Sequence, residues 1–361
     1  MDWGTAERVA GWVVRRQSMP AGYRPDALQT QFDELTREAE GLVVAATGLE
    51  PAGPARARVT DRLGWVRANV GSMQRLLAPT LERYEARRKQ SPFAPFLAAL
   101  PPQLSGFGRT ASGAEVGALL GWMSQRVLGQ YDLLLTDEFP EDQDLVYYVG
   151  PNVVAMEQRY GFAEREFRLW LALHEVTHRC QFTAVPWLRD HFVSLVDSGL
   201  EPFASDPSHM ADSLKRAAGE WRAGRSPLDD AGVLGLIATP AQREALQRIQ
   251  ALMSLLEGHG DVTMDRAGAA AVPGAERFAR VLHDRRQSVR GPTKVLQQIL
   301  GIEAKMRQYA EGEKFVHAVE VAGGPELFNS VWRGPEWLPS LAEIRDPAVW
   351  LSRVGASPAL G

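Results

Sequence analysis

Hydrophobic residues recur at helical spacing along most of the chain, and stretches in which apolar and polar residues alternate are few. Apolar positions three and four residues apart are typical of amphipathic helices, and turn-forming clusters separate these stretches. The pattern predicts helices over residues 5–16, 31–47, 66–88, 114–128, 164–182, 193–200, 212–222, 240–256, 275–284 and 292–309.

One stretch has the character of a strand. Residues 145–149 read Leu-Val-Tyr-Tyr-Val and follow a break at residues 140–143. We expect residues 150–152 to form a turn, and residues 153–156 to begin a second strand or to lead into the next segment. The predicted fold class is mainly α with a small β-sheet. An edge strand of such a sheet can hold an extended peptide by main-chain hydrogen bonds, but this strand is equally compatible with a purely structural place in the core.

The strongest breaks lie at residues 48–54 and 91–102, where proline and glycine accumulate. We expect a helical amino-terminal region over residues 1–135 and a second region over residues 136–361, which contains the candidate metal ligands His174, His178 and Glu257. Since both regions are predicted to be helical, one continuous domain is the alternative. With 361 residues, 45% of them hydrophobic, the chain can bury a sizeable core in either case.

The composition restricts partners and location. A net charge of −4 gives no broad basic surface, so we expect no nucleic-acid partner. One cysteine allows no internal disulfide, and the first seven residues lack a basic start followed by an apolar run. We therefore expect a cytoplasmic protein. Its oligomeric state is not fixed by the sequence.

The stretch 111–128 comes nearest to a membrane-spanning segment, but it is short and is interrupted by Glu115, Gln125 and Arg126. Its glycines stand four residues apart, at 113, 117 and 121. Small residues at this spacing allow another helix to approach closely. We therefore interpret the stretch as a buried helix and expect no contact with a membrane.

The most informative motif is His174-Glu175-Val176-Thr177-His178, which spells H-E-x-x-H within a predicted helix. Residues four apart share a helix face, so both imidazoles can reach one metal ion while Glu175 stands beside it. Phe167, Trp170 and Leu171 lie on the same stripe. The alternative, a chance match, would leave two imidazoles on a buried face without a metal. Zn²⁺ is the expected cofactor, although iron, cobalt and nickel bind similar ligands.

A third ligand must come from elsewhere, because catalytic zinc usually has three protein ligands and one open position. The residues after His178 lack the third histidine of the extended metzincin pattern, and Cys180 faces away from the metal as a small core residue. Glu257 is the preferred ligand, with Asp261 one turn further supporting a ligand histidine. His259 is the rival ligand. The alternative for Glu257 and Asp261 is that both are carboxylates on a solvated helix end and bind no metal.

Several blocks together resemble a family of bacterial zincin-like metallopeptidases, mostly actinobacterial, of which some are labelled as associated with deazaflavin coenzyme biosynthesis. The blocks are Asp61–Val70, Val149–Asn152, Phe167–Trp170, His174–Arg179, Val185–Arg189, Glu257–Asp261, Met264–Asp265 and Arg307–Val316. The resemblance implies a zincin-like fold and a hydrolase or peptidase activity, with His174 and His178 as metal ligands and Glu175 as base. It supplies no substrate.

The expected function is zinc-dependent hydrolysis of a peptide or a small amide, in which Glu175 takes the proton of a zinc-activated water. His259 or Tyr309 is a candidate donor to the oxyanion, although Tyr309 equally suits a packed helix end. Two alternatives stay open: a metal-stabilised zincin-like scaffold or binding protein without turnover, and an accessory enzyme of coenzyme metabolism.

Overall fold

The computed structural model of the protein describes residues 2–90, 102–132, 144–199, 239–287 and 302–355. The chain forms two compact units. Unit 1 comprises Met1–Thr183 and Ala267–Phe278, and unit 2 comprises Ala184–Arg266 and Ala279–Gly361. The predicted fold class, mainly α with a small sheet, is confirmed. The division expected near residue 135 stays a prediction.

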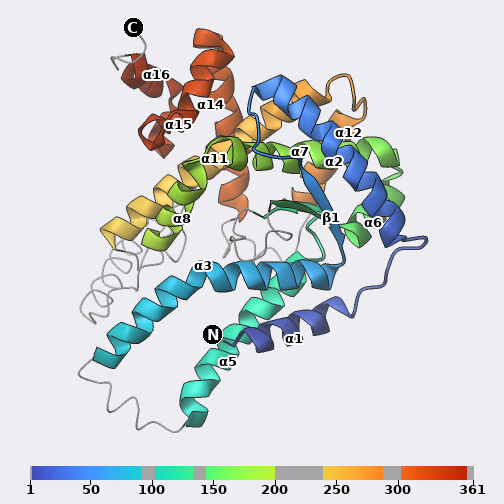
Figure 1. Ribbon diagram of the computed structural model, residues 1–361, viewed down its shortest axis with the longest axis vertical. Helices are drawn as coiled ribbons and strands as arrows, with labels where there is room; N and C mark the ends of the chain where they lie inside the picture. Colours follow the sequence, from blue (N-terminus) through green and yellow to red (C-terminus); the bar gives the residue numbers. More distant parts are fainter. Residues whose placement is uncertain (1, 91–101, 133–143, 200–238, 288–301, 356–361) are drawn as a thin grey trace. The chain divides into compact units, whose positions relative to one another are not determined.

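Unit 1 contains the sheet and the helix that carries the H-E-x-x-H motif (Figure 1). Its elements are α1 (Trp3–Val14), α2 (Pro25–Thr47), β1 (Arg56–Thr60), α3 (Arg62–Gln90), α5 (Pro102–Met123), β2 (Gly129–Tyr131), β3 (Leu145–Val149), α6 (Gly150–Tyr160) and α7 (Glu164–Ala184).

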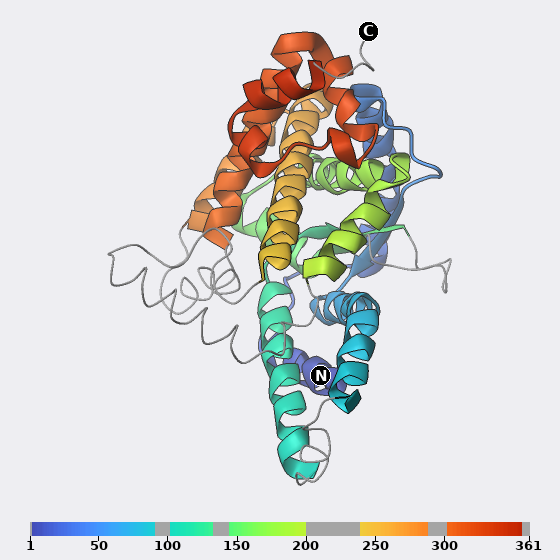
Figure 2. The same ribbon diagram turned by 90° about the vertical axis from the view of Figure 1, so that its left-hand side faces the viewer.

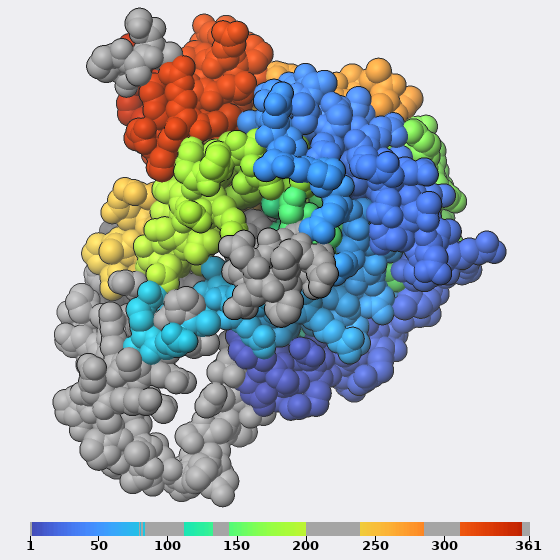
Figure 3. All heavy atoms as spheres, viewed as in Figure 1, coloured from blue at the N-terminus to red at the C-terminus, as the bar shows by residue number. Residues whose placement is uncertain are grey.

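Strand β3 lies at the centre of the sheet, in the order β1-β3-β2. It pairs in parallel with β1 and antiparallel with β2, and all five of its residues are buried. Helix α2 packs on β3, since the Phe32 and Tyr148 rings stack 3.8 Å apart and the Thr36 and Tyr148 hydroxyls lie 2.9 Å apart. The opposite side of α2 is seen at the surface in Figure 3. The apolar strand predicted from the sequence therefore forms the core of the sheet.

The outer edge of β1 is closed by one side chain of α2. The Gln29 amide nitrogen donates to the Ala57 carbonyl at 3.1 Å, and the Val59 N–H donates to the Gln29 carbonyl oxygen at 2.7 Å. These are the backbone groups that a further strand would use. The amide of Gln29 therefore takes the place of a neighbouring strand at this edge.

Helices α1 and α5 lie against each other through glycine (Figure 1). A methyl group at Gly113 or Gly117 would overlap the backbone of α1 at Asp2 or Ala6, and one at Gly121 would lie 2.9 Å from Val13. The predicted glycine contact is thus confirmed. Among the described residues, no helix is long and apolar enough to cross a membrane.

The predicted turn at residues 150–152 is wrong, because these residues begin helix α6. Pro151 lies in the first turn of α6, where its missing N–H costs no helical hydrogen bond, and Gly161 ends the helix with a φ of 59°. Residues 153–156 continue the helix and form no strand. The Asn152 amide donates to the carbonyls of Ser124 and Val127, each at 2.7 Å. It thus links the start of α6 to the chain that follows α5.

Unit 2 is built from helices. Its elements are α8 (Leu188–Gly199), α11 (Pro240–Gly268), α12 (Ala275–Gln287), α14 (Ile302–Asn329), the 3-10 helices η2 (Ser330–Trp332) and η3 (Pro335–Trp337), α15 (Leu341–Arg345) and α16 (Pro347–Gly355). The end of α11 and the start of α12 belong to unit 1. The helix predicted over residues 212–222 and the start of that predicted over 292–309 lie outside the described residues.

Helix α11 continues twelve residues beyond its predicted end at Leu256 and stops at Gly268. Gly258 and Gly260 suggested an end because glycine weakens helices. Instead, α14 crosses α11 at backbone contact, where a methyl group at Gly312 would overlap the Ser254 carbonyl and one at Gly258 would overlap the Gly312 backbone (Figure 2). The glycine at 258 is therefore required by packing, and Glu257 lies inside the helix.

Candidate metal centre

Helix α7 carries both motif histidines. The His174 and His178 rings are one turn apart, with centroids 4.7 Å from each other and planes inclined by 86°. Both are partly exposed, whereas Glu175, Val176 and Thr177 between them are buried. The sequence produces this local arrangement because a helix repeats its faces every three to four residues. The two imidazoles are thus brought together on a face of α7 that is only partly covered.

The Nδ1 atom of His178 lies 3.0 Å from the amide oxygen of Gln181, three residues further along α7. Gln181 is fully buried, so its side chain is fixed. An amide oxygen can only accept, which places the proton on Nδ1 and a lone pair on Nε2 of a neutral imidazole. Such a partner orients a ligand histidine and fixes its tautomer.

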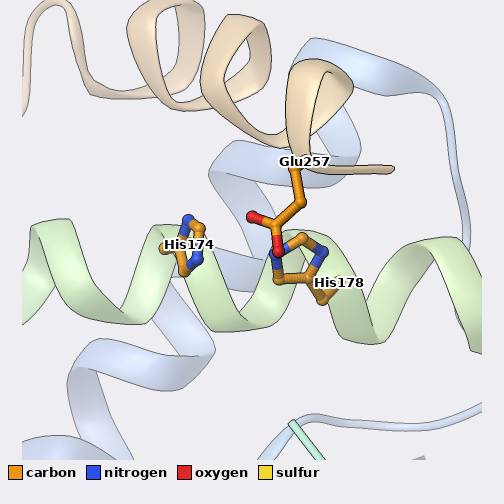
Figure 4. A group of neighbouring side chains, drawn as sticks. All are labelled: His174, His178 and Glu257. Carbon is orange, nitrogen blue, oxygen red and sulfur yellow. The ribbon is translucent and has the colours of Figure 1, made fainter. Parts of the chain in front are cut away.

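Glu257 completes a group of three candidate ligands. One donor atom each from His174, His178 and Glu257 lie within 4.8 Å of one another, and all three residues are partly exposed. Figure 4 shows the Glu257 carboxylate extending toward the imidazoles from its own helix. Two imidazole nitrogens and one carboxylate oxygen are the ligand set of one common class of catalytic zinc site. Among the described residues, this is the one group of three such side chains whose donor atoms lie this close together.

The rival ligand His259 is not in that group. It is 4% exposed, its ring stacks on Phe328 with centroids 5.2 Å apart, and Trp332 stands edge-on at 5.4 Å. Residues two apart on a helix point about 200° from each other, so His259 and Glu257 leave α11 on different sides. Asp261, by contrast, is one turn beyond Glu257 because α11 continues through Gly260. The roles of these residues stay predictions.

Tyr309 lies within α14, but its side chain lies outside the described residues. Its candidate role as a donor to an oxyanion therefore stays a prediction.

Glu175 lies against the short strand β2. The residue is 7% exposed, and its Oε2 atom accepts a hydrogen bond from the Tyr131 N–H at 3.0 Å. The neighbouring Gly129 approaches so closely that a Cβ there would lie 2.8 Å from Glu175 Cγ. The residue expected to act as base is thus held by backbone.

A buried ion network holds α7 in place. Arg179 is fully buried and forms ion pairs with Asp144 at 2.5 Å and Glu40 at 2.6 Å, and it also donates to the Gly53 carbonyl at 2.6 Å. Burial opposes the charge, but the hydrogen bonds and charges of these partners outweigh it and raise the pKa of Arg179. The guanidinium therefore stays charged and ties the helix to α2 and to the start of β3.

Cys180 is buried, as expected for a small core residue that faces away from the metal. Burial raises the pKa of its thiol to about 12. A protonated, buried thiol is neither a good nucleophile nor a good metal ligand.

The sequence interpretation missed Gln181, Gly129, Tyr131 and the partners of Arg179. A signal existed for Gln181, because an amide three residues after a ligand histidine lies within reach of its ring. None existed for the backbone N–H of Tyr131. This N–H lies beside Glu175 because the three-residue strand β2 pairs with β3, and that pairing cannot be predicted from the local sequence.

Comparisons with known proteins identify the family of the chain. A family model described as zincin-like metallopeptidase matches residues 1–351. The crystal structure of "a putative hydrolase with a novel fold" from Chloroflexus aurantiacus is 28% identical in sequence, covers 99% of each chain and superposes with a TM-score of 0.70. No curated protein matches. The actinobacterial and coenzyme associations stay predictions, and the family resemblance is confirmed: the chain belongs to the zincin-like metallopeptidase family.

Proposed function

We propose that the protein is a zinc-dependent hydrolase that cleaves a peptide bond or a related amide bond. The observation that carries the proposal is the His174, His178 and Glu257 group, whose donor atoms lie within 4.8 Å of one another. Membership of the family and similarity to a structure described as a hydrolase support the reaction class.

The donor set fits a zinc ion. Three protein ligands leave one position open for water or substrate, which distinguishes a catalytic from a structural zinc site. The hydrogen bond from Nδ1 to Gln181 leaves Nε2 of His178 as the atom that would bind the metal. A carboxylate from Glu257 would offset part of the positive charge. These side chains can therefore hold the metal that the family implies.

When bound, zinc supplies a Lewis acid that acidifies water and polarises the carbonyl of the substrate. Glu175 is the proposed general base: it accepts the proton of the attacking water and delivers it to the leaving nitrogen. Its Oε2 atom accepts a hydrogen bond from the Tyr131 N–H, which restrains the carboxylate. The chain thus provides both the metal ligands and a proton carrier.

A metal-stabilised scaffold without turnover is the second reading. A structural zinc site usually has four protein ligands, whereas the group found among the described residues has three. The presence of Glu175 in the motif also favours the enzyme, because a base would have no task at a purely structural site. An accessory enzyme of coenzyme metabolism, the third reading, would hold the metal with the same residues but use it for other chemistry.

The test compares zinc-loaded wild type, the metal-free protein and Glu175→Gln on libraries of peptides and small amides. We expect zinc-dependent hydrolysis by wild type and a loss of at least about a hundredfold in Glu175→Gln, with the zinc retained. The amide replaces the carboxylate at nearly equal size and is therefore the matched control for metal binding. Absence of hydrolysis by fully zinc-loaded wild type would favour the scaffold.

A further inference from the structure

Strand β2 (Gly129–Tyr131) and the carboxylate of Glu175 fit each other closely. We propose that β2 is a backbone platform that positions this carboxylate, and that helix α3 holds the platform in place through Gln130. That this positioning serves proton transfer by Glu175 rests on the proposed function. Gly129, Gln130 and Tyr131 are thus positioning residues.

The contact has two parts. The Tyr131 N–H donates to Glu175 Oε2 at 3.0 Å, which fixes one carboxylate oxygen. At Gly129, a Cβ would lie 2.8 Å from both Cγ and Oε1 of Glu175, closer than real Cβ atoms come to other atoms. The backbone at 129 does not have a positive φ. A side chain at 129 would therefore displace the Glu175 side chain.

The pairing of β2 explains why this N–H is available. Val149 N–H donates to the Leu128 carbonyl at 2.8 Å, and Asp132 N–H donates to the Leu145 carbonyl at 3.3 Å. In an antiparallel pair, successive residues direct their backbone groups alternately toward and away from the partner strand. Residues 129 and 131 therefore point away from β3. The N–H that holds Glu175 is a group that the sheet does not use.

A strand of three residues needs support beyond its own ladder, and α3 supplies it. The Trp65 indole N–H donates to the Gln130 amide oxygen at 2.8 Å, and the Gln130 amide nitrogen donates to Asn69 at 3.1 Å. Ser72 donates to the Asp132 carboxylate at 2.9 Å. Trp65, Asn69 and Ser72 recur at helical spacing and so lie on one face of α3.

This arrangement gives a role to a sequence block that the metal chemistry leaves unused. Trp65 and Asn69 belong to the block Asp61–Val70, which contributes to the family resemblance but lies about a hundred residues before the motif. Through Gln130, the block acts on the position of Glu175. A displacement of about 1 Å in a reacting group can cost a hundredfold in rate, so such support has kinetic consequences.

The first test is Gly129→Ala in the zinc-loaded protein. We expect the added methyl to displace Glu175 and to lower kcat by about 10- to 100-fold, with the zinc retained and KM changed less than about threefold. The matched control is Gly274→Ala. The Gly274 N–H donates to the Glu166 carboxylate at 2.9 Å. A Cβ at Gly274 would lie 2.8 Å from the Phe278 side chain, so the added methyl is equally crowded there.

A rescue separates positioning from loss of stability. In Gly129→Ala/Glu175→Asp the shorter acid leaves room for the methyl, so we expect kcat no lower than in Glu175→Asp alone, a non-additive result. If Gly129→Ala does not fold, Gln130→Met removes the amide contacts to α3 at similar size. We expect it to lower kcat about tenfold, also with the zinc retained.

Amide hydrogen exchange at Tyr131 tests the platform without a substrate. We expect at least about tenfold faster exchange in Glu175→Ala than in wild type, because the N–H loses its acceptor. Fast exchange in the variant together with no hydrolysis by wild type would refute the proposed function but keep the platform. Equal exchange in both proteins, or equal losses of kcat in Gly129→Ala and Gly274→Ala, would overturn the platform.

Discussion

His178 and Gln181 form a hydrogen bond of 3.0 Å between Nδ1 and the amide oxygen, within one turn of the helix that carries the motif. This contact sets the tautomer of the imidazole before any metal is present. Gln181 is fully buried, so the orientation does not depend on solvent. The imidazole of this candidate ligand is therefore oriented in advance.

Replacement of Gln181 should therefore weaken metal binding without removing a ligand. We expect Gln181→Met to lower zinc affinity by about 10- to 100-fold, as is usual for the hydrogen-bond partner of a ligand histidine. Competition with a chromogenic chelator measures the change. Thr177→Val is the control, because it removes another buried hydrogen bond of α7, from the Thr177 hydroxyl to the Leu173 carbonyl at 2.7 Å. Equal affinities in the two variants would contradict the role of Gln181.

Removal of either motif histidine should abolish stoichiometric zinc. We expect about one equivalent in wild type and much less in His174→Ala or His178→Ala, since two ligands rarely hold zinc. Zinc binds a site that exists only in the folded state, so chelation should lower the Tm of wild type but leave that of the variants unchanged. Elemental analysis and thermal unfolding with and without chelator check this. A variant that keeps a full equivalent refutes the assignment.

The third ligand can be identified by comparing two residues of one helix. We expect Glu257→Ala to lose zinc, while His259→Ala keeps zinc but unfolds at lower temperature, because its ring packs between Phe328 and Trp332. Asp261→Ala should weaken zinc binding by about 10- to 100-fold if it supports a ligand histidine. Zinc content and Tm give the answer. The reverse pattern would mean a site of three histidines.

Cys180 should make the protein sensitive to alkaline pH. Burial raises the pKa of the thiol from 9.0 to about 12, so above about pH 9 the unfolded chain loses this proton before the folded protein does. The free energy of unfolding should therefore fall between about pH 9 and pH 12. Cys180→Ala should flatten this fall when denaturation is measured across that range. In native wild type the thiol should also resist alkylation at neutral pH, and rapid labelling would contradict its burial.

Helices could be predicted where local pattern and tertiary packing agree. Residues 164–182 were predicted as helical, and α7 covers Glu164–Ala184, because its apolar positions follow one stripe and Pro186 stands just beyond its end. The end of α11 was missed because Gly258 indicates a break locally, whereas the close crossing with Gly312 is a tertiary requirement. From its local sequence Gly258 therefore predicts the end of a helix, whereas in the folded structure it allows the helix to continue past α14.

Short strands and cross-chain contacts could not be predicted. Strand β1 alternates polar and apolar residues over only five positions, and β2 has three residues, so both are too short to be recognised from their own pattern. Both pair with β3. The two histidines could be placed together because a helix repeats over four residues. The contacts of Glu175 with β2 and of Arg179 with Glu40 join residues 44 and 139 apart in sequence. Such contacts follow from the fold.

The amide of Gln29, which bonds to Ala57 and Val59, also affects how the molecule meets other chains. An unprotected edge strand is a template on which extended segments assemble, and this is a common route to aggregation. Here the donor and the acceptor that such a segment would need first are already occupied from within the chain. The small sheet is consequently terminated on the β1 side by a single side chain, so that growth by strand addition there would first require the helix that carries Gln29 to release it.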